Sequence, residues 1–593
     1  MKKKIWDKGL YIEGLRRGRT MTIVFAIIAL LTVLFTCASV MSEGREIADT
    51  AEYGSFVTSE ETGDMYAWFS IAIFLVAAPF LTLRTFSFLN SRSACDYWHA
   101  VPHTRTCLYV SFLSALLTEY VFLLTVTGVS AWLAFLVSSR FIRLVPGTLI
   151  LFLTGAFAAS LLTTGVLTLA MSRTGTLLSN IVIGGIILAL PRTLILCVTE
   201  MIIGSLPQVY DSNIFPFSDP GYNIPFGIIA GFDPDTVRLP SSILYTAALG
   251  VIYLVIALCL FRTRKSESAG VAAPSRRLQT VCRIAVGCSV SFIVTVYLVD
   301  ELMNGSTYYL PFMIFYTIAA ILYFVYELMT TKRAKNLVKA LPGLCVVIAL
   351  NIILGFAVYG IYVYEDAFGK NADKIKSVSL ISDSYENRYT ITLAEYALNC
   401  CGESRITDRE LIGMLSDALN TNTERTDKGQ IATVKIEIRT AVAAKNRRVF
   451  LTSKQMTKLT EGLQNTDEFN RYMTEIPKAD EYGNNAWIVN SKDGNHYEST
   501  VFLDGEKTDV IRSLLAEDIK ALGTEKWLEM NYKTQTESED GYGFLLLEIS
   551  GGDVLSRNGR RYHTSVRIPI SLQETPGTFA KLLEYDGEQA EHQ

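Results

Sequence analysis

The chain contains 593 residues, of which 50% are hydrophobic, and it carries a formal net charge of −4 at pH 7. Its length exceeds that of a single domain, and its slight acidity argues against a nucleic-acid-binding surface, so no nucleic-acid partner is expected. The ten cysteines lie mostly in apolar stretches and lack the spacing of a disulfide framework or of a zinc site.

The amino-terminal residues 1–19 combine basic side chains with apolar ones such as Ile5, Trp6 and Leu10. This mixture is typical of a short amphipathic helix that lies in the lipid headgroup layer. We therefore expect a cytoplasmic amphipathic segment, with a disordered basic tail as the alternative.

Nine apolar stretches follow, each with roughly the 20 residues needed to cross a hydrocarbon layer of ~30 Å. Lipid offers the backbone no hydrogen-bond partners, so stretches of this length are expected to be helices. They cover residues 20–41, 65–83, 108–133, 148–171, 179–202, 242–261, 281–299, 309–330 and 342–363.

Lysines and arginines between these stretches fall mainly on alternate connections. One set of connections, beginning with residues 1–19, carries twenty of them, whereas the opposite set carries four. Basic residues near span ends are retained in the cytoplasm during insertion, so the amino terminus is expected inside and the carboxy-terminal region outside. The outer connection 203–241 is rich in proline and aromatic residues, which predicts an irregular or re-entrant loop that either caps a pathway or packs as a lid.

Near residues 364–366 the composition becomes polar and the periodicities become those of a soluble protein. Alternating Val434, Ile436 and Ile438 predict a strand, and residues 407–410 form a capping box that opens a helix. A second capping box begins at Thr452. Further strands are predicted at 387–393, 447–451, 498–503, 543–549 and 562–570, with a helix at 507–521.

These patterns predict a mostly α polytopic membrane bundle of about nine transmembrane helices, followed by an α+β extracytoplasmic domain at 365–593 that is either one domain or two small subdomains. No enzyme is expected, because the sequence contains no phosphate loop of the form GxxxxGK(S/T) and no HExxH or GxSxG motif.

The connection 84–106 contains the sequence DYWHAVPHTR, which runs from Asp96 to Arg105. Its aromatic residues Tyr97 and Trp98, beside charged residues and Pro102, suit a short amphipathic helix that docks on a cytoplasmic partner. An interfacial anchor is the alternative. Asp96, His99 and His103 could approach one another on a helix, but Pro102 interrupts that helix, so no metal site is expected.

The DYWHAVPHTR sequence resembles the "DYYHSLP-R" stretch of bacterial ABC transporter permeases of the type-2 exporter class. Residues 172–177 also resemble the "TGN" turn of that group, with Thr176 in place of asparagine. The resemblance covers residues 1 to about 262 and implies a six-span permease core at 20–262. The three additional spans at 263–364 and the outer domain resemble the longer members of the group, in which a stretch like 564–583 is familiar.

This resemblance implies a transmembrane permease subunit of an ATP-driven exporter in a bacterial cytoplasmic membrane, with an unknown substrate. A separate ATP-binding subunit would dock on Asp96, Tyr97, Trp98, His99, Pro102 and Arg105. ATP and magnesium would be bound by that subunit, and no cofactor is expected in this chain. The other expected partners are membrane lipid and a second permease chain, in a homodimer or a heterodimer. A membrane sensor with an extracytoplasmic ligand-binding domain is the alternative function.

Two ionisable residues lie deep within predicted spans, Glu119 in the third and Arg192, beside Pro191, in the fifth. Placing a charge at that depth costs free energy unless the charge is paired or in contact with water. We therefore expect the two side chains to pair or to line a polar route. The alternative is a break at Pro191 that turns the fifth span into a half-helix. Arg283 is expected to snorkel, and Asn351 to form an interhelical hydrogen bond.

Overall fold

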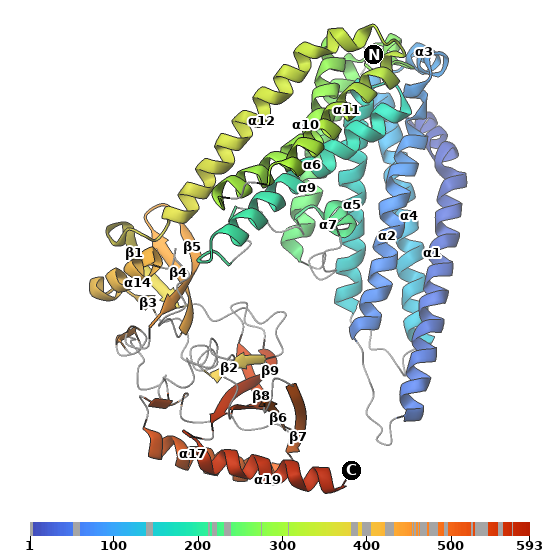
Figure 1. Ribbon diagram of the computed structural model, residues 1–593. Coiled ribbons are helices and arrows are strands. Elements are labelled where there is room, and N and C mark those ends of the chain that lie inside the picture. Colours follow the sequence, from blue (N-terminus) through green and yellow to red (C-terminus); the bar gives the residue numbers. More distant parts are fainter. Residues whose placement is uncertain are drawn as a thin grey trace. The chain divides into compact units, whose positions relative to one another are not determined.

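The computed structural model describes residues 4–50, 60–137, 146–210 and 239–380, except 274, 306 and 307, together with parts of 214–230 and of 390–592. Long helices dominate the first 367 residues (Figure 1). They are α1 (Lys8–Thr50), α2 (Glu60–Thr85), α4 (Arg105–Val137), α5 (Pro146–Arg173), α6 (Leu177–Ser205), α9 (Pro240–Thr263), α10 (Arg276–Met303), α11 (Leu310–Thr331) and α12 (Asn336–Ala367).

Within the described residues, seven helices are long and apolar enough to cross a membrane, so the chain is a membrane protein. They correspond to the last seven of the nine predicted stretches, from 108–133 to 342–363. The stretches 20–41 and 65–83 fall within α1 and α2. The total of nine spans stays a prediction.

The amino-terminal segment differs from the expected short helix or disordered tail. Helix α1 begins at Lys8 and continues without a break into the first predicted span. The start of α1 and the residues just before it are fixed to α4, because Trp6 donates to Ser114 Oγ at 3.0 Å and Tyr11 donates to Thr118 Oγ1 at 3.1 Å. Side-chain bonds to α4 therefore position this segment.

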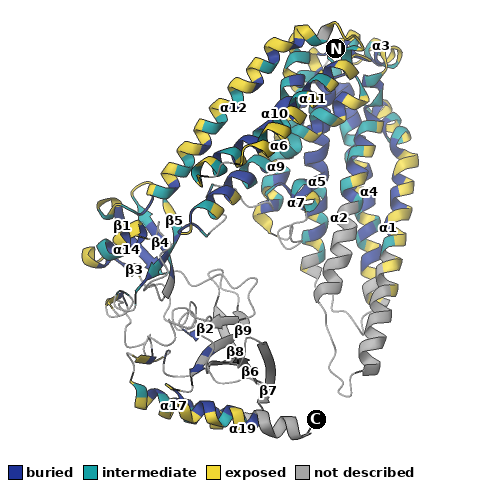
Figure 2. Cartoon of the chain, in the orientation of Figure 1, coloured by how far each residue is buried: buried dark blue, intermediate teal, exposed yellow. Residues whose placement is uncertain are grey.

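A buried cluster of hydroxyl groups joins three helices of the bundle. Thr82 of α2, Tyr120 of α4 and Thr164 of α5 lie within 2.8 to 3.1 Å of one another, and all three side chains are fully buried. Such groups hold membrane helices together, because each would otherwise lack a hydrogen-bond partner in hydrocarbon. Figure 2 shows the contrast between the buried residues of α5 and the largely exposed α12.

Among the residues of the predicted irregular loop 203–241 that the structure describes lies a short helix, α7 (Ile224–Ile229). The side chain of Asn223 caps it by accepting a hydrogen bond from the main-chain N–H of Phe226 at 3.2 Å. Ile224 is buried against Phe152 and Ala159 of α5. This part of the loop is therefore packed and helical.

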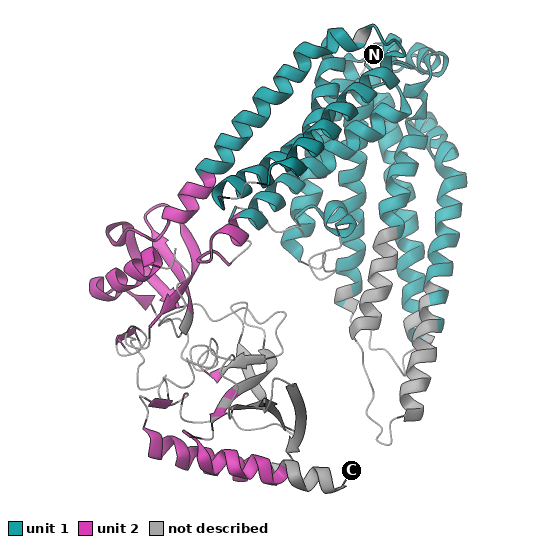
Figure 3. Cartoon of the chain, viewed as in Figure 1, with its two compact units in different colours: residues 1–201, 212–360 teal, residues 202–211, 361–593 magenta. Residues whose placement is uncertain are grey.

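The chain divides into two compact units, one formed by residues 1–201 and 212–360 and the other by 202–211 and 361–593 (Figure 3). Two sheets are seen among the described residues of the second unit. The first has the strand order β3-β1-β4-β5 and is antiparallel throughout. Its strands are β1 (Ile375–Leu380), β3 (Arg405–Ile406), β4 (Ala432–Thr440) and β5 (Ala444–Leu451), and α14 (Arg409–Thr421) contributes Leu411 and Leu415 to the shared core.

The second sheet has the order β2-β9-β8-β6-β7, with β2 parallel to β9 and the other pairs antiparallel. Its strands are β2 (Thr390–Thr392), β6 (Asn484–Ser491), β7 (His496–Leu503), β8 (Phe544–Leu555) and β9 (Arg561–Ser571). Helices α17 (Gly505–Leu522) and α19 (Pro576–His592) belong to the same unit.

The predicted strands at 434–438, 447–451, 498–503, 543–549 and 562–570 and the helices opening at 407 and 507 are confirmed. Of the predicted strand at 387–393, residues 390–392 form β2. Residues 387–389 and 543 lie outside the described residues. The capping box at Thr452 is also formed: its main-chain N–H donates to Gln455 Oε1 at 2.9 Å, and the N–H of Gln455 donates back to Thr452 Oγ1 at 3.4 Å. Strands β1, β3 and β6 and helix α19 were not predicted.

Candidate coupling surface and buried polar clusters

The segment that resembles the permease docking sequence forms a short helix, α3 (Arg92–Ala100), preceded by the 3-10 turn η1 (Ser87–Asn90). Helix α3 ends before Pro102, as predicted, and α4 begins at Arg105. Because proline disfavours helical geometry in the residue before it, this break separates α3 from α4.

Trp98 anchors α3 to the bundle. It is only 9% exposed, and its ring lies 5.3 Å from Phe112 of α4 and 6.2 Å from Phe88 of η1, between ring centroids. The guanidinium of Arg17 in α1 stands 4.7 Å from the Trp98 ring centroid, which is cation–π distance. Trp98 thus contacts three elements and fixes one face of α3.

The neighbouring face of α3, which carries Asp96 and Tyr97, is open. Tyr97 is 66% exposed and Asp96 and Pro102 are also exposed, whereas His99 and Arg105 are partly buried. The Cys95 thiol lies 3.7 Å from His99 Nδ1. Burial, together with the charges of Arg105 and Arg264, lowers the pKa of His99 to about 4, so this imidazole is neutral at pH 7. The described residues contain no cluster of three or more metal-ligating side chains.

Arg264, just after α9, is a residue that sequence reasoning missed. Its guanidinium donates to three main-chain carbonyl oxygens: Leu89 at 2.8 Å, Thr174 at 2.8 Å and Met171. It is 3% exposed, and this burial lowers its pKa to about 10, which leaves it charged at pH 7. A cation at the end of α5 also interacts favourably with the helix dipole. One side chain therefore joins η1, α5 and α9.

The turn after α5 is bound to the segment after α9. The N–H of Gly175 donates to the carbonyl of Val271 at 3.0 Å, and that of Gly270 donates back to the carbonyl of Gly175 at 2.9 Å. A Cβ at position 175 would collide with the carbonyl oxygen of Ser268, so only glycine allows this approach. In the same turn, Thr174 donates to Asn180 at 2.5 Å, and Asn180 donates to Asn90 of η1 at 2.7 Å. We call η1, α3, the turn 174–176 and residues 264–271 the hub.

The structure does not bring Glu119 and Arg192 together. Glu119 is buried in α4 against Gly18 of α1, where a Cβ would collide with its carboxylate. Among the described residues, no ion pair joins Glu119 to Arg192.

Arg192 is 5% exposed and lies over the rings of Tyr222 and Tyr245, at 5.9 and 5.4 Å from their centroids. It lines a cavity of about 180 Å³ with Asn223 and Tyr253. Helix α6 continues through Pro191, so the predicted break into a half-helix is wrong.

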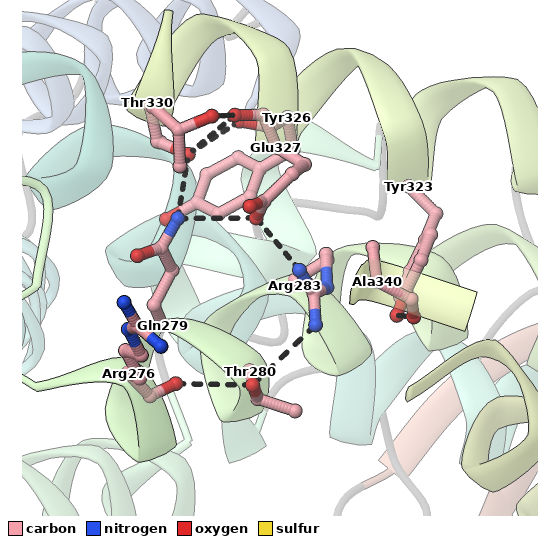
Figure 4. A network of polar contacts seen from close by, with 10 residues as sticks. Arg276, Gln279, Thr280, Arg283, Tyr323, Tyr326, Glu327, Thr330 and Ala340 are labelled. Carbon is pink, nitrogen blue, oxygen red and sulfur yellow. Dashed lines mark hydrogen bonds and ion pairs between the residues drawn. The ribbon is translucent and has the colours of Figure 1, made fainter. Parts of the chain in front are cut away.

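Arg283 does not snorkel. It forms a buried ion pair with Glu327 of α11, with 2.7 Å between Nη1 and Oε2 (Figure 4). Gln279 donates to the same oxygen at 3.0 Å, and the guanidinium lies 5.0 Å from the centroid of the Tyr323 ring. Glu327 was missed, although a carboxylate within the apolar stretch 309–330 is a signal for such a pair.

The predicted interhelical hydrogen bond of Asn351 is confirmed. Its amide nitrogen donates to Ser291 Oγ at 2.9 Å, and its amide oxygen accepts from Thr295 Oγ1 at 2.6 Å. Asn351 therefore links α12 to α10.

A further buried network in the second unit was missed. Arg447 of β5 donates to the Glu365 carboxylate at 2.8 Å, and Lys445 pairs with the same carboxylate. The neighbouring Asp366 accepts from Gln208 at 3.0 Å and pairs with Lys370 at 2.6 Å. The end of α12, strand β5 and the segment after α6 are thus joined by polar contacts.

Comparison of the chain with protein-family models, with curated proteins and with solved structures gave no significant match.

Proposed function

We propose that the chain is the transmembrane permease subunit of an ATP-driven transporter of the ABC type-2 exporter class. A separate ATP-binding subunit would bind ATP and magnesium and dock on the exposed face of α3. Support comes from the resemblance of residues 96–105 to the docking stretch of such permeases and from the way α3 is mounted. Its Tyr97 face is open while the adjacent Trp98 is clamped to three elements.

The contacts of Trp98 with three elements, beside an exposed Tyr97, are the observation that best supports the proposal. A force applied at Asp96 or Tyr97 reaches α4 through the contact of Trp98 with Phe112, and reaches α1 through Arg17. The hub bonds of Arg264 connect η1 to the ends of α5 and α9. Motion of the docked subunit would rock these helices between inward and outward openings, with no covalent chemistry in this chain.

The proposal includes a topology. The amino terminus and the hub would be cytoplasmic, and residues beyond 366 would lie outside a bacterial cytoplasmic membrane. At least two permease chains, identical or different, would surround the exported substrate. Protease added to intact cells should then cleave beyond residue 366 and spare Lys265 and Lys335; the reverse pattern would place the ATPase and α3 on opposite sides of the membrane.

The docking test is co-purification with an ATP-binding subunit encoded beside this chain. In mild detergent the two polypeptides should elute together, and the variant Tyr97→Ala should weaken the complex by about tenfold, as expected for an aromatic interface residue. Tyr308→Ala is the matched control, because Tyr308 is 79% exposed but lies outside the hub. If no ATP-binding subunit accompanies the wild-type chain, the proposal fails and a membrane sensor becomes the better account.

A further inference from the structure

Helices α10, α11 and α12 enclose a cavity of about 600 Å³ within the first unit. Most of its lining is aliphatic or aromatic, and small residues such as Gly287, Ala320 and Gly355 leave room along its walls. This volume is within the range of small-molecule sites in proteins, roughly 300–1,000 Å³. The cavity is thus large enough for a ligand.

The cavity is elongated. On α12 the lining runs from Leu344 to Tyr359, which at 1.5 Å per residue is a length of ~22 Å. An elongated cavity with apolar walls suits a linear hydrocarbon chain. We call this cavity the slot.

The slot opens sideways at residues that would face lipid. Ile352 and Phe356 line it and are also 55% and 74% exposed. All three helices belong to the set that can span a membrane. A hydrocarbon chain can therefore enter from the bilayer without crossing water.

The polar groups in the slot already form hydrogen bonds with one another. Asn351 is bonded to Ser291 and Thr295, and the hydroxyl of Tyr316 lies 2.8 Å from Thr295 Oγ1. Groups that already satisfy one another do not require a polar ligand. The rest of the wall can therefore bind a ligand only through apolar contacts.

From these observations we propose that the slot between α10, α11 and α12 binds an acyl chain of a membrane phospholipid. The site lies outside the hub and does not depend on the proposed docking of an ATP-binding subunit. It would give the three additional helices a resident lipid chain between α12 and its neighbours.

The test is photolabelling in lipid nanodiscs with a phosphatidylcholine that carries a diazirine midway along one acyl chain. The buried residues that line the slot include the apolar Val299, Ala319 and Val347. Lipid that only surrounds the protein cannot reach them, so adducts on these residues, found by peptide mass spectrometry, report a chain inside the slot. Adducts on Leu244, which is 72% exposed, provide the reference for surrounding lipid.

Gly355→Leu should fill the slot, because a Cβ at this position meets only Thr295 and Val299 at ordinary contact distances. It should lower labelling of the three buried residues by about tenfold and leave labelling of Leu244 unchanged. Gly360→Leu is the matched control on the same helix, where a Cβ has open space, and should label like the wild type.

Ala320→Leu fills the slot from α11 and replaces Gly355→Leu should that variant fail to purify as a single species. The proposal is overturned if adducts occur only on exposed residues such as Phe356 and Leu244, or if both filling variants label the buried residues normally. A disulfide between two chains that carry Val299→Cys would also overturn it, since a second copy would then occupy the slot.

Discussion

Arg447 donates two hydrogen bonds to Glu365, one to its carboxylate at 2.8 Å and one to its main-chain carbonyl at 3.1 Å. Both side chains are 2% exposed. The pair joins the last turn of α12 to strand β5 across 82 residues of sequence. Because the carboxylate and the carbonyl belong to the same residue, the guanidinium fixes both the side chain and the backbone at this point.

Arg447→Leu should destabilise the second unit by about 1–3 kcal/mol, because it removes one of the two cations that contact the buried Glu365 carboxylate and leaves Lys445 as its counter-charge. Hydrogen exchange of residues 444–451 in the full chain measures this loss as faster exchange. The matched control is Lys458→Ala, which breaks the exposed pair with Glu410 and should change exchange by no more than about 1 kcal/mol. Equal effects of the two variants would show that the buried Glu365 pair contributes no more to stability than the exposed Lys458–Glu410 pair.

The Arg283–Glu327 pair allows a test by double substitution. Glu327→Met alone should cost about 3–5 kcal/mol, since it leaves the Arg283 guanidinium buried without its counter-charge. The double variant Arg283→Met with Glu327→Met should recover most of that loss, because neither charge then remains. The thermal aggregation midpoint in detergent provides the measurement. A double variant that is less stable than Glu327→Met would contradict this reasoning.

Gly18 should tolerate no larger residue. A side chain at this position collides with the Glu119 carboxylate, so Gly18→Val should push α1 away from α4 and cost about 1–3 kcal/mol. Gly185→Val in α6 is the control, because a Cβ there meets no atom within 4 Å. The same aggregation assay compares the two variants, and an equal midpoint for both would exclude a close α1–α4 contact at Gly18.

We expect the stability of α3 to decrease at acidic pH because of His99. Its folded-state pKa of about 4 lies below its ordinary value of 6.5, so the unfolded segment binds the proton more tightly than the folded one. Its contribution to stability is therefore fully present above pH 6.5 and is lost as the pH falls toward 4. Exchange protection of residues 92–105, corrected for intrinsic rates, should fall across this window in the wild type. His99→Gln should flatten the profile, and an unchanged profile would assign the acid sensitivity to another group.

Patterns confined to one contiguous stretch were sufficient to predict several elements. The capping box at 407–410 and the alternation at 434–438 correctly predicted α14 and β4, and Pro102 correctly predicted the end of α3. In each case the determining residues are close neighbours in the chain, so periodicity and backbone sterics contain the necessary information.

Contacts between distant residues were not accessible in this way. Arg264 bonds to carbonyls that lie 90 and 175 residues away, and no local pattern distinguishes it from an ordinary basic residue after a span. The Arg283–Glu327 pair, in contrast, was predictable from the sequence. Each residue lies within a predicted span, and a charge buried in a span requires a partner of opposite charge. For Glu119 and Arg192, depth left pairing and a shared polar route as alternatives, since it does not specify which helix faces are adjacent; the described residues show no ion pair between the two.

The bonds of Arg264 end on main-chain oxygens of Leu89, Met171 and Thr174. Every amino acid has a main-chain carbonyl oxygen, so a substitution at any of these three positions leaves the acceptor of the Arg264 hydrogen bond in place. The guanidinium has no equivalent substitute, because lysine lacks the forked geometry that reaches several acceptors at once. Divergent versions of this protein should therefore keep an arginine at position 264 even where the residues at positions 89, 171 and 174 differ.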